Sequence, residues 1–475
     1  MWAFVAQTAL ATLATAALVF VYRWIRSRAP LAAFLFAAGL VARIAVGAGL
    51  ALSWLSTAPP AAVFTPDARW FPDAQMYYED ASLAADVGLT EISDSQASPT
   101  FVRSLAIWMR MAGPSHGAAH LLNVLVYAAV SLGICLALTR RRDAIGARAT
   151  ALVVGVFALS PNLIILASQP LKDTLFFGAL ALVVIGLWWV LPDTPGAPVR
   201  LAPVPLALVL LGIYLMSGMR AYFGLMILGL LGGVLFLRGV ALIRQQGRVP
   251  WRYVGAVAVV LAVVWTGCRV GGGPYYQSLV EPVMLPVMIK VDDAVDAVRG
   301  AFGQNAPTRP PRGAGDAGFL SVVERSRRGF EASGGGTNMA TSELDRSGRE
   351  GLVGKVGGAL LGLSAVFVPV SLLRATGLVH FTGGGRMLLL TDVDTLFLDL
   401  TIAACLVLVW RHRREIGGAW TLAAFLLVLG VVSALLVGYV VTNYGTLFRL
   451  RLLAVVPFWL LPLVLARPAA PAARA

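Results

Sequence analysis

The sequence predicts an all-α polytopic integral membrane protein. Of its 475 residues, 58% are hydrophobic and 13% are charged, whereas soluble domains carry roughly 25% charged residues. The apolar residues gather in runs of about 20, the length of helix that crosses a hydrocarbon core ~30 Å thick. The net charge of +14 comes mostly from arginine, because Lys172, Lys290 and Lys355 are the only lysines. With no soluble basic domain in the chain, we expect no nucleic-acid partner.

The apolar runs predict 11 or 12 membrane-spanning helices. The expected segments are 2–22, 31–55, 118–138, 149–168, 173–191, 202–218, 222–243, 253–270, 352–373, 387–410, 418–441 and 452–466. The first lacks a basic leading region and an obvious cleavage site, which indicates a retained span. We expect five parts: an extra N-terminal helix (1–30), a membrane core (31–270) with a first outer loop (57–117), a large polar loop (271–351), C-terminal helices (352–466) and a tail (467–475).

Short arginine-rich loops indicate which way the chain is threaded, because such loops stay on the cytoplasmic side. The densest are 23–28, 140–143, 244–252 and 411–414. The first three fit one alternation with the N-terminus outside, which puts loops 57–117 and 271–351 on the extracytoplasmic side. The fourth joins them only if segment 352–373 does not cross fully. The sequence leaves open whether that segment is re-entrant or 411–414 lies outside.

The first outer loop contains an unusual cluster of carboxylates and aromatic residues, FTPDARWFPDAQMYYEDASLAAD (64–86). A single acidic residue in a loop is ordinarily a solvated surface group. Here Asp73, Tyr77 and Asp80 follow helical spacing on one face, and Pro72 defines where that helix begins. Partial desolvation beside aromatic residues would raise the pKa of a carboxyl group toward the working range of a general base.

These residues resemble the GT-C superfamily of membrane glycosyltransferases. The pattern Asp73-x-x-x-Tyr77-x-x-x-Ala81 follows a span that bears a lone arginine, Arg43. Segments 98–138 (SPTFVRSLAIWMRMAGPSH and the following span) and 158–182 (ALSPNLIILASQPLKDTLFFGALAL) resemble the next helices of that superfamily. The likeness is greatest to protein O-mannosyltransferases and bacterial lipid A aminoarabinose transferases, and it covers about 31–191.

The resemblance implies a transferase that takes a sugar from a polyprenyl-phosphate donor and places it on an extracytoplasmic glycan, lipid or protein of the cell envelope. It implies a bacterial cytoplasmic membrane, with the active site facing outward. Carried over, the catalytic residue is Asp73. Asp67 is the fallback, because it also follows a proline, but Asp73 alone has the tyrosine at the superfamily spacing.

Three further polar positions lie where helices enter the membrane. Lys172 and Asp173 open one apolar helix; the simple interpretation is a dipole-favoured Asp and a Lys whose ammonium reaches the interface. The functional interpretation is that Lys172 contacts the carrier phosphate and Asp173 orients it or the acceptor. Arg220, beside Tyr222, falls on the side where arginine is disfavoured, so it is expected to bind an anion.

The last position is TNYGTLFRLRLL, where Asn443, Arg449 and Arg451 precede the final span. Arg449 and Arg451 are two residues apart and so point apart on a helix, which leaves one of them free to face lipid headgroups. Interfacial anchoring and donor binding are both open for each. The predicted substrate-binding set is Tyr77, Asp67, Lys172, Asp173, Arg220, Tyr222, Asn443 and Arg449.

The sequence assigns no metal site. His116 and His120 share a helical spacing of four but have no third ligand, so a divalent cation stays an open alternative. Cys135, Cys268 and Cys405 lie inside apolar runs and are expected to be small buried hydrophobes.

Two other functions share these features. A polysaccharide polymerase of the O-antigen type also uses a lipid-linked donor and a large outer loop, but depends on arginines more than on a carboxylate base. A flippase or transporter for lipid-linked glycans should show two similar halves with broken helices, and no such internal symmetry is evident.

Overall fold

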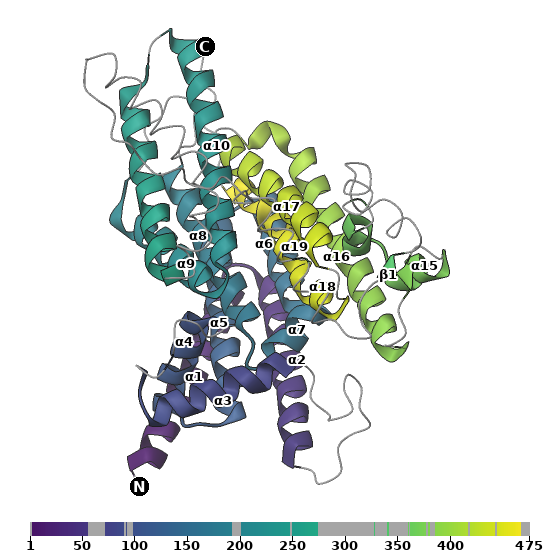
Figure 1. Ribbon diagram of the computed structural model, residues 1–475. Coiled ribbons are helices and arrows are strands. Elements are labelled where there is room, and N and C mark those ends of the chain that lie inside the picture. Colours follow the sequence, from purple (N-terminus) through teal and green to yellow (C-terminus); the bar gives the residue numbers. More distant parts are fainter. Residues whose placement is uncertain are drawn as a thin grey trace, which may run out of the picture.

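The computed structural model describes residues 2–55, 72–89, 98–191, 201–247, 249–273, 362–376, 385–416, 419–441 and 444–466, together with 92, 327, 340–341, 360 and 379–380. These residues are overwhelmingly helical, and the helices gather into one bundle (Figure 1). The described strands, β1 (Ala340–Thr341) and β2 (Val379–His380), form one short antiparallel pair.

Nine described helical segments are long and apolar enough to cross a membrane, and ten if a bent pair counts as one span. They are α1 (Trp2–Arg26), α2 (Pro30–Leu55), α5 (His116–Leu138), α8 (Lys172–Val190), α10 (Ala221–Gln246), an unlabelled helix (Trp251–Gly273), α16 (Gly385–Arg411), α17 (Trp420–Val440) and the run of α18 (Tyr444–Leu450), α19 (Leu452–Leu460) and η5 (Leu461–Ala466). The bent pair is α6 (Ala144–Leu159) with α7 (Pro161–Ala167), and α9 (Pro203–Met219) is shorter, at 17 residues. The prediction of a polytopic helical membrane protein is confirmed.

Segment 352–373 differs from the expected helix. In its described part, residues 362–367 are helical, the helix breaks at Val368 and Pro369, and α15 (Val370–Ala375) follows. Proline lacks the N–H that would continue the helical hydrogen bonding. A Cβ placed on Gly438, near the end of α17, would lie 2.6 Å from the carbonyl carbon of Gly362, so the two backbones touch. The Ser371 N–H donates to the Asp392 carboxylate in the first half of α16. Residues 362–376 therefore stay near one end of α16 and α17.

Contacts between distant parts of the chain show that the basic loops share one end of the bundle. Arg141, between α5 and α6, forms an ion pair with Glu415, which follows α16. Arg238, in the second half of α10, donates to the Thr421 hydroxyl at the start of α17 over 2.6 Å. Loops 140–143 and 411–414 thus lie on the same side, and the alternative in which 411–414 lies opposite is wrong.

The loop between α1 and α2 lies at this basic-loop end as well. A Cβ on Gly47, late in α2, would lie 2.5 Å from Nε2 of His120 in the first turn of α5. The beginning of α2 must therefore lie beside the end of α5. The opposite end of the bundle carries the starts of α5, α8 and α10, and we call it the α3 end.

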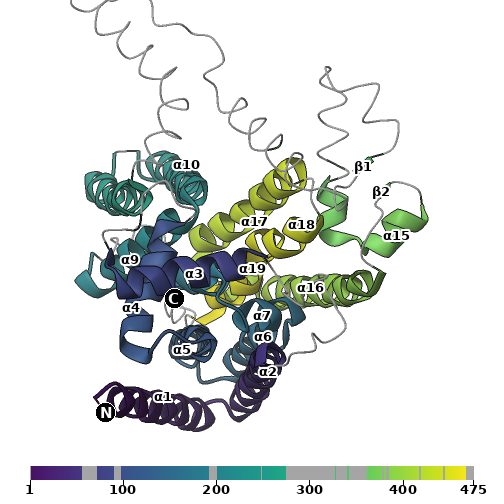
Figure 2. The ribbon, with the colours of Figure 1, turned by 60° about the horizontal axis from the view of Figure 1, so that its bottom comes forward.

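The α3 end is covered by two helices too short to cross a membrane, α3 (Pro72–Asp86) and α4 (Pro99–Ala112). They pack on each other across the ends of the spans (Figure 2). The buried face of α3 consists of Ala74, Tyr77, Ala81 and Ala84, the i, i+3, i+7 spacing of a helix with one apolar side. Arg110 of α4 donates to the Ala84 and Ala85 carbonyls and so satisfies the end of α3.

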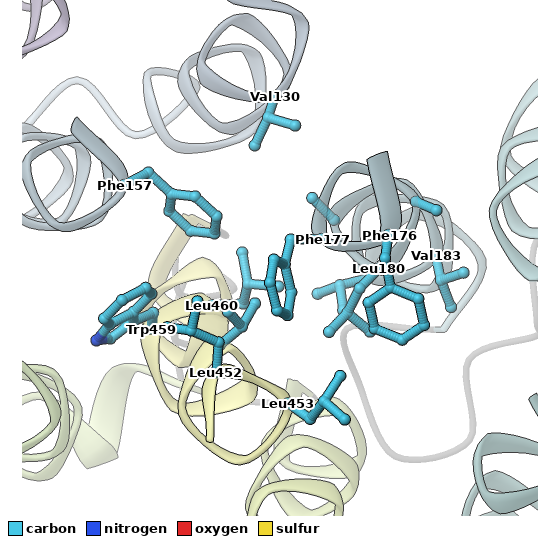
Figure 3. Packing of buried hydrophobic residues seen from close by; sticks show 14 of the residues in the cluster. Val130, Phe157, Phe176, Phe177, Leu180, Val183, Leu452, Leu453, Trp459 and Leu460 are labelled. Atoms are coloured by element: carbon cyan, nitrogen blue, oxygen red, sulfur yellow. The ribbon is translucent and has the colours of Figure 1, made fainter. Parts of the chain in front are cut away.

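The bundle centre is formed by α8 and α19. Figure 3 shows Phe177 of α8 pointing toward Leu452 and Leu460 of α19, and all three are at most 2% exposed. In their most apolar stretches, 83% of α8 and all of the last span are buried inside the protein. Because both helices lack a lipid-facing side, polar residues at their α3 ends are surrounded by protein.

Glycines set the close packing of α8 on α9. A Cβ on Gly212 would lie 2.6 Å from the carbonyl oxygen of Ala179, and one on Gly186 would lie 2.8 Å from that of Pro205. Without side chains at these points the two helices approach closely, which is the usual way in which membrane helices associate. This packing brings the end of α9 beside the start of α8.

The break between α6 and α7, at Ser160 and Pro161, bends the chain by 56° within the bundle. A break frees backbone carbonyl groups that membrane interior cannot hydrate. Arg43 of α2, 2% exposed, donates to the carbonyls of Phe157 (2.6 Å) and Ala158 (2.9 Å). The lone arginine of the second span therefore closes the end of α6.

Candidate functional site

Four charged side chains form one chain of ion pairs at the α3 end. Arg220 Nη2 lies 2.5 Å from Asp173 Oδ1, and Arg449 Nη2 lies 3.0 Å from Asp173 Oδ2. Arg449 Nη1 then reaches Asp73 Oδ2 at 2.6 Å. The order is Arg220–Asp173–Arg449–Asp73, and it joins the α9–α10 junction, α8, α18 and α3.

Asp173 is the buried centre of this chain. It is 0% exposed, and it lies in the first turn of α8, where the helix dipole favours a negative charge. Each carboxylate oxygen accepts from a different arginine, so the desolvation cost of the charge is offset by paired, hydrogen-bonded partners. Asp173 thereby holds Arg220 and Arg449 in place. That it also orients a substrate stays a prediction.

Asp73 is the accessible carboxylate of the chain. It lies in the first turn of α3, directly after Pro72, and its side chain is 47% exposed although one oxygen is bound by Arg449. Asp173 fixes Arg449, and Arg449 in turn orients Asp73. The half-exposed carboxylate is therefore held in one direction while remaining open to a second molecule.

Arg220 occupies the junction at which α9 ends and α10 begins. Its Nη1 donates to the Tyr222 hydroxyl over 3.4 Å, and its guanidinium lies 5.3 Å from the centre of the Phe176 ring. Arg220 is 7% exposed, whereas Tyr222 is 44% exposed. The arginine is thus an internal part of the site, and Tyr222 is its surface-facing neighbour.

Lys172 lies beside the chain of ion pairs but outside it. Its Nζ donates to Ser98 Oγ over 2.5 Å and lies 5.5 Å from the centre of the Tyr77 ring. Among the described residues, no carboxylate forms an ion pair with Lys172. The basic side chains of this site, Lys172, Arg220 and Arg449, therefore outnumber its carboxylates, Asp73 and Asp173, by one.

Ser98 connects Lys172 to the rest of the site. Its hydroxyl donates to the carbonyl of Met219, the residue before Arg220. Ser98 precedes α4 with φ at 65°, and it is the one non-glycine with a positive φ in the described part of the chain. A left-handed backbone costs roughly 1–2 kcal/mol in a residue with a Cβ, and such strain gathers at functional sites.

The ring of Tyr77 lies beside the Lys172 ammonium group. It is 2% exposed and packs edge-on against Phe101 of α4, with ring centres 5.2 Å apart. Burial raises the pKa of the Tyr77 phenol to about 12, so the ring stays neutral across the working pH range. Asp80, on the same helix, does not join the ion pairs; burial followed by repulsion from Glu79 raises the pKa of its carboxyl group.

The structure brings together seven of the nine predicted site residues. They are Asp73, Tyr77, Lys172, Asp173, Arg220, Tyr222 and Arg449. Asp67 and Asn443 lie outside the described residues.

Two features of the site differ from the sequence-based expectation or were missed by it. Neither Arg449 nor Arg451 faces headgroups, because they are 8% and 1% exposed and both pair with carboxylates. Sequence reasoning missed Ser98 and Phe176. The Ser-Pro pair before α4 is a helix-start signal, but nothing in it shows that the hydroxyl would meet a lysine.

The described residues contain no group of three His, Cys, Asp or Glu that could hold a metal ion. Nδ1 of His120 lies 3.1 Å from the Ala167 carbonyl oxygen, which gives that ring a structural contact. Cys135, Cys268 and Cys405 are each buried and free, as expected.

The fold and the site define a polytopic helical membrane protein with a cationic, carboxylate-bearing site at one end of its bundle. No family model, curated protein or solved structure matches this chain. The resemblance to GT-C glycosyltransferases therefore stays a prediction.

Proposed function

We propose that this protein is a glycosyltransferase that moves a sugar from a polyprenyl-phosphate donor to an extracytoplasmic glycan, lipid or protein acceptor. The observation that carries the proposal is the Arg220–Asp173–Arg449–Asp73 chain with Lys172 beside it. It combines one reachable carboxylate with three basic side chains that are held in place. A sugar phosphodiester needs both, because its leaving group gains negative charge as the acceptor loses a proton.

Lys172 supports the assignment of the phosphate-binding position. Among the described residues, no carboxylate forms an ion pair with Lys172. Its Nζ is held by Ser98 at the first residue of α8. The first turn of a helix also favours anions through its free N–H groups. Arg220 and Arg449 are already paired with Asp173. They therefore act on the phosphate as fixed positive charges beyond Lys172 rather than as direct ligands.

The reaction follows from these positions. An acceptor hydroxyl oxygen attacks the anomeric carbon while the bond from that carbon to the phosphate oxygen breaks, and the configuration inverts. The hydroxyl proton passes to the free oxygen of Asp73, and polyprenyl phosphate leaves with its new charge beside Lys172. Arg449 touches Asp73 and so fixes the direction from which the proton is taken.

The proposed side of the membrane is extracytoplasmic. Contacts among the described residues place the arginine-rich loops 23–28, 140–143 and 411–414 at the basic-loop end. The site lies at the opposite, α3 end. By the positive-inside tendency, the basic-loop end faces the cytoplasm. A bacterial cytoplasmic membrane fits this arrangement, with the donor lipid reaching the site from the outer leaflet.

A polysaccharide polymerase is the second candidate. It is favoured by one observation: Asp73 is already bound by Arg449, so the arginines rather than the carboxylate could carry the chemistry. The two candidates differ in which substitution is most damaging. Loss of Asp73 is the most harmful change in a transferase with a carboxylate base, and loss of Arg449 in an arginine-dependent polymerase.

The deciding experiment uses the purified chain in lipid vesicles with radiolabelled polyprenyl-phosphate sugars. Acceptor panels of glycans, lipids and peptides are added, and labelled product and remaining donor are measured. A transferase consumes donor only with its acceptor and adds one sugar. Products that grow by repeated units indicate the polymerase, and movement of intact donor across the vesicle wall without new bonds contradicts both.

A further inference from the structure

A second buried polar group lies next to the site, one step deeper in the bundle. Asp394 of α16 pairs with Arg451, and its other oxygen accepts from the backbone N–H of Asn162 over 3.1 Å. The Asn162 side-chain amide donates to the carbonyl of Phe448 over 2.5 Å. Asn162 and Asp394 are 0% exposed and Arg451 is 1% exposed.

These contacts close a ring. It runs from Asp394 to Arg451, back along the chain to the Phe448 carbonyl, on to Asn162, and from the Asn162 N–H to Asp394 again. We call it the Asp394 ring. It ties α16, α7 and the α18–α19 junction together at a depth where unpaired polar groups are costly.

Arg449 lies inside the segment that this ring holds, between Phe448 and Arg451. In a helix each residue turns by about 100°, so Arg449 and Arg451 point about 160° apart. A rotation of α18 that moved Arg449 away from Asp173 would pull Arg451 from Asp394 and the Phe448 carbonyl from Asn162. Holding the far side of the helix therefore fixes the direction of Arg449.

We propose that Asp394 and Asn162 are positioning residues: through Arg451 and the Phe448 carbonyl, they hold Arg449 in contact with Asp173 and Asp73. Neither contacts the described charged residues of the site directly. The kinetic part of this inference rests on the proposed function, whereas its structural part, the placement of Arg449, does not.

The first test measures the coupling between Arg449 and Asp173 by thermal unfolding in vesicles or detergent. Asp173→Asn, Arg449→Gln and the double variant are compared in two backgrounds: the parent chain, and a chain with Asp394→Leu and Arg451→Leu. Replacing a buried pair with apolar residues avoids an uncompensated charge. We expect the two site substitutions to be non-additive in the parent and additive without the ring. Equal coupling in both backgrounds would overturn the proposal.

Asn162→Ala provides a second route that leaves every charge paired. It should weaken the Arg449–Asp173 coupling in the same direction, and it decides the question if the double-leucine background does not fold. The matched control is Arg141→Gln with Glu415→Gln, which removes an ion pair at the basic-loop end. That control should keep the coupling at its parent value; a loss there as well would show that any missing ion pair loosens the site and would contradict a specific role for the ring.

The second test uses transfer activity. If the Asp394 ring positions Arg449, variants that break the ring should lower kcat/KM by about tenfold or more, the range of one charge-assisted hydrogen bond. Adding Arg449→Gln to such a variant should then cause little further loss. Full additivity of the two losses would contradict the proposal. If the parent chain transfers no sugar at all, the proposed function fails while the coupling measurement still decides the role of the ring.

Discussion

Nη1 of Arg449 lies 2.6 Å from Oδ2 of Asp73, although 376 positions separate the two residues in the chain. The same guanidinium holds Asp173 with its other nitrogen. A single arginine thus connects a buried carboxylate to an accessible one.

The first prediction concerns the accessible carboxylate. Asp73→Asn keeps the shape and a hydrogen bond to Arg449 but cannot take a proton, so transfer should fall by at least ~10²-fold, the lower end for a general base. Turnover of vesicle-reconstituted protein is the measurement. Asp86→Asn, on the exposed side of the same helix, is the control and should leave turnover unchanged. Near-full activity of Asp73→Asn with a lost activity of Asp67→Asn would move the catalytic role to Asp67.

The second prediction separates Lys172 from Arg220 as phosphate contacts. Lys172→Gln removes the basic group with which no described carboxylate pairs, and donor KM should rise by roughly ten- to a hundred-fold. Lys172→Arg restores a charge and should recover part of the affinity. Donor titrations at saturating acceptor give these values. A donor KM that stays at the wild-type value in Lys172→Gln would rule out Lys172 as the anion contact.

Arg220 should behave differently, because its planar fork spans Asp173 and Tyr222. Lysine cannot reproduce two divergent N–H bonds, so both Arg220→Lys and Arg220→Ala should lower transfer and unfolding temperature together. Parallel thermal melts and donor titrations test this. If both variants match wild type at every donor concentration, Arg220 has no part in the site.

Ser98 allows strain and function to be measured apart. Ser98→Gly and Ser98→Ala both remove the hydroxyl that holds Lys172, so both should raise donor KM to a similar extent. Glycine adopts the left-handed backbone without cost, whereas alanine keeps a penalty of about 1 kcal/mol. The glycine variant should therefore be the more stable of the two in thermal unfolding. A donor KM that is normal in both variants would remove Ser98 from the site.

The sidedness of the bundle can be tested with cysteine labelling. The three native cysteines are 0% exposed, so background labelling should be low. Asp86→Cys on α3 should react with a membrane-impermeant maleimide in intact cells, and Arg414→Cys should react only after lysis. The reverse pattern would place the site in the cytoplasm and exclude an extracytoplasmic acceptor.

Several structural relationships could not be predicted from the sequence. Local pattern does not reveal that Asp173 is buried between two arginines that come from distant helices. It does not reveal the carboxylate partner of Arg451 either, because Asp394 lies in another span. The position of 411–414 depended on whether 352–373 crosses, and the Arg141–Glu415 pair decided it. Each of these depends on how helices pack, which no local pattern records.

Local sequence pattern is enough to assign this chain to the polytopic helical membrane proteins and to select polar residues that the fold brings together. Hydropathy and arginine placement are properties of short segments, so the membrane helices, three of the four basic loops, and the residues Asp73, Lys172 and Arg220 could be selected from local pattern. Helix packing decides which arginines and carboxylates form ion pairs, and it leaves Lys172 without a carboxylate partner among the described residues. The reason is physical: ion pairs form between side chains that helix packing brings within about 3 Å, and the glycine contacts of α8 with α9 and the apolar contacts of α8 with α19 set those distances.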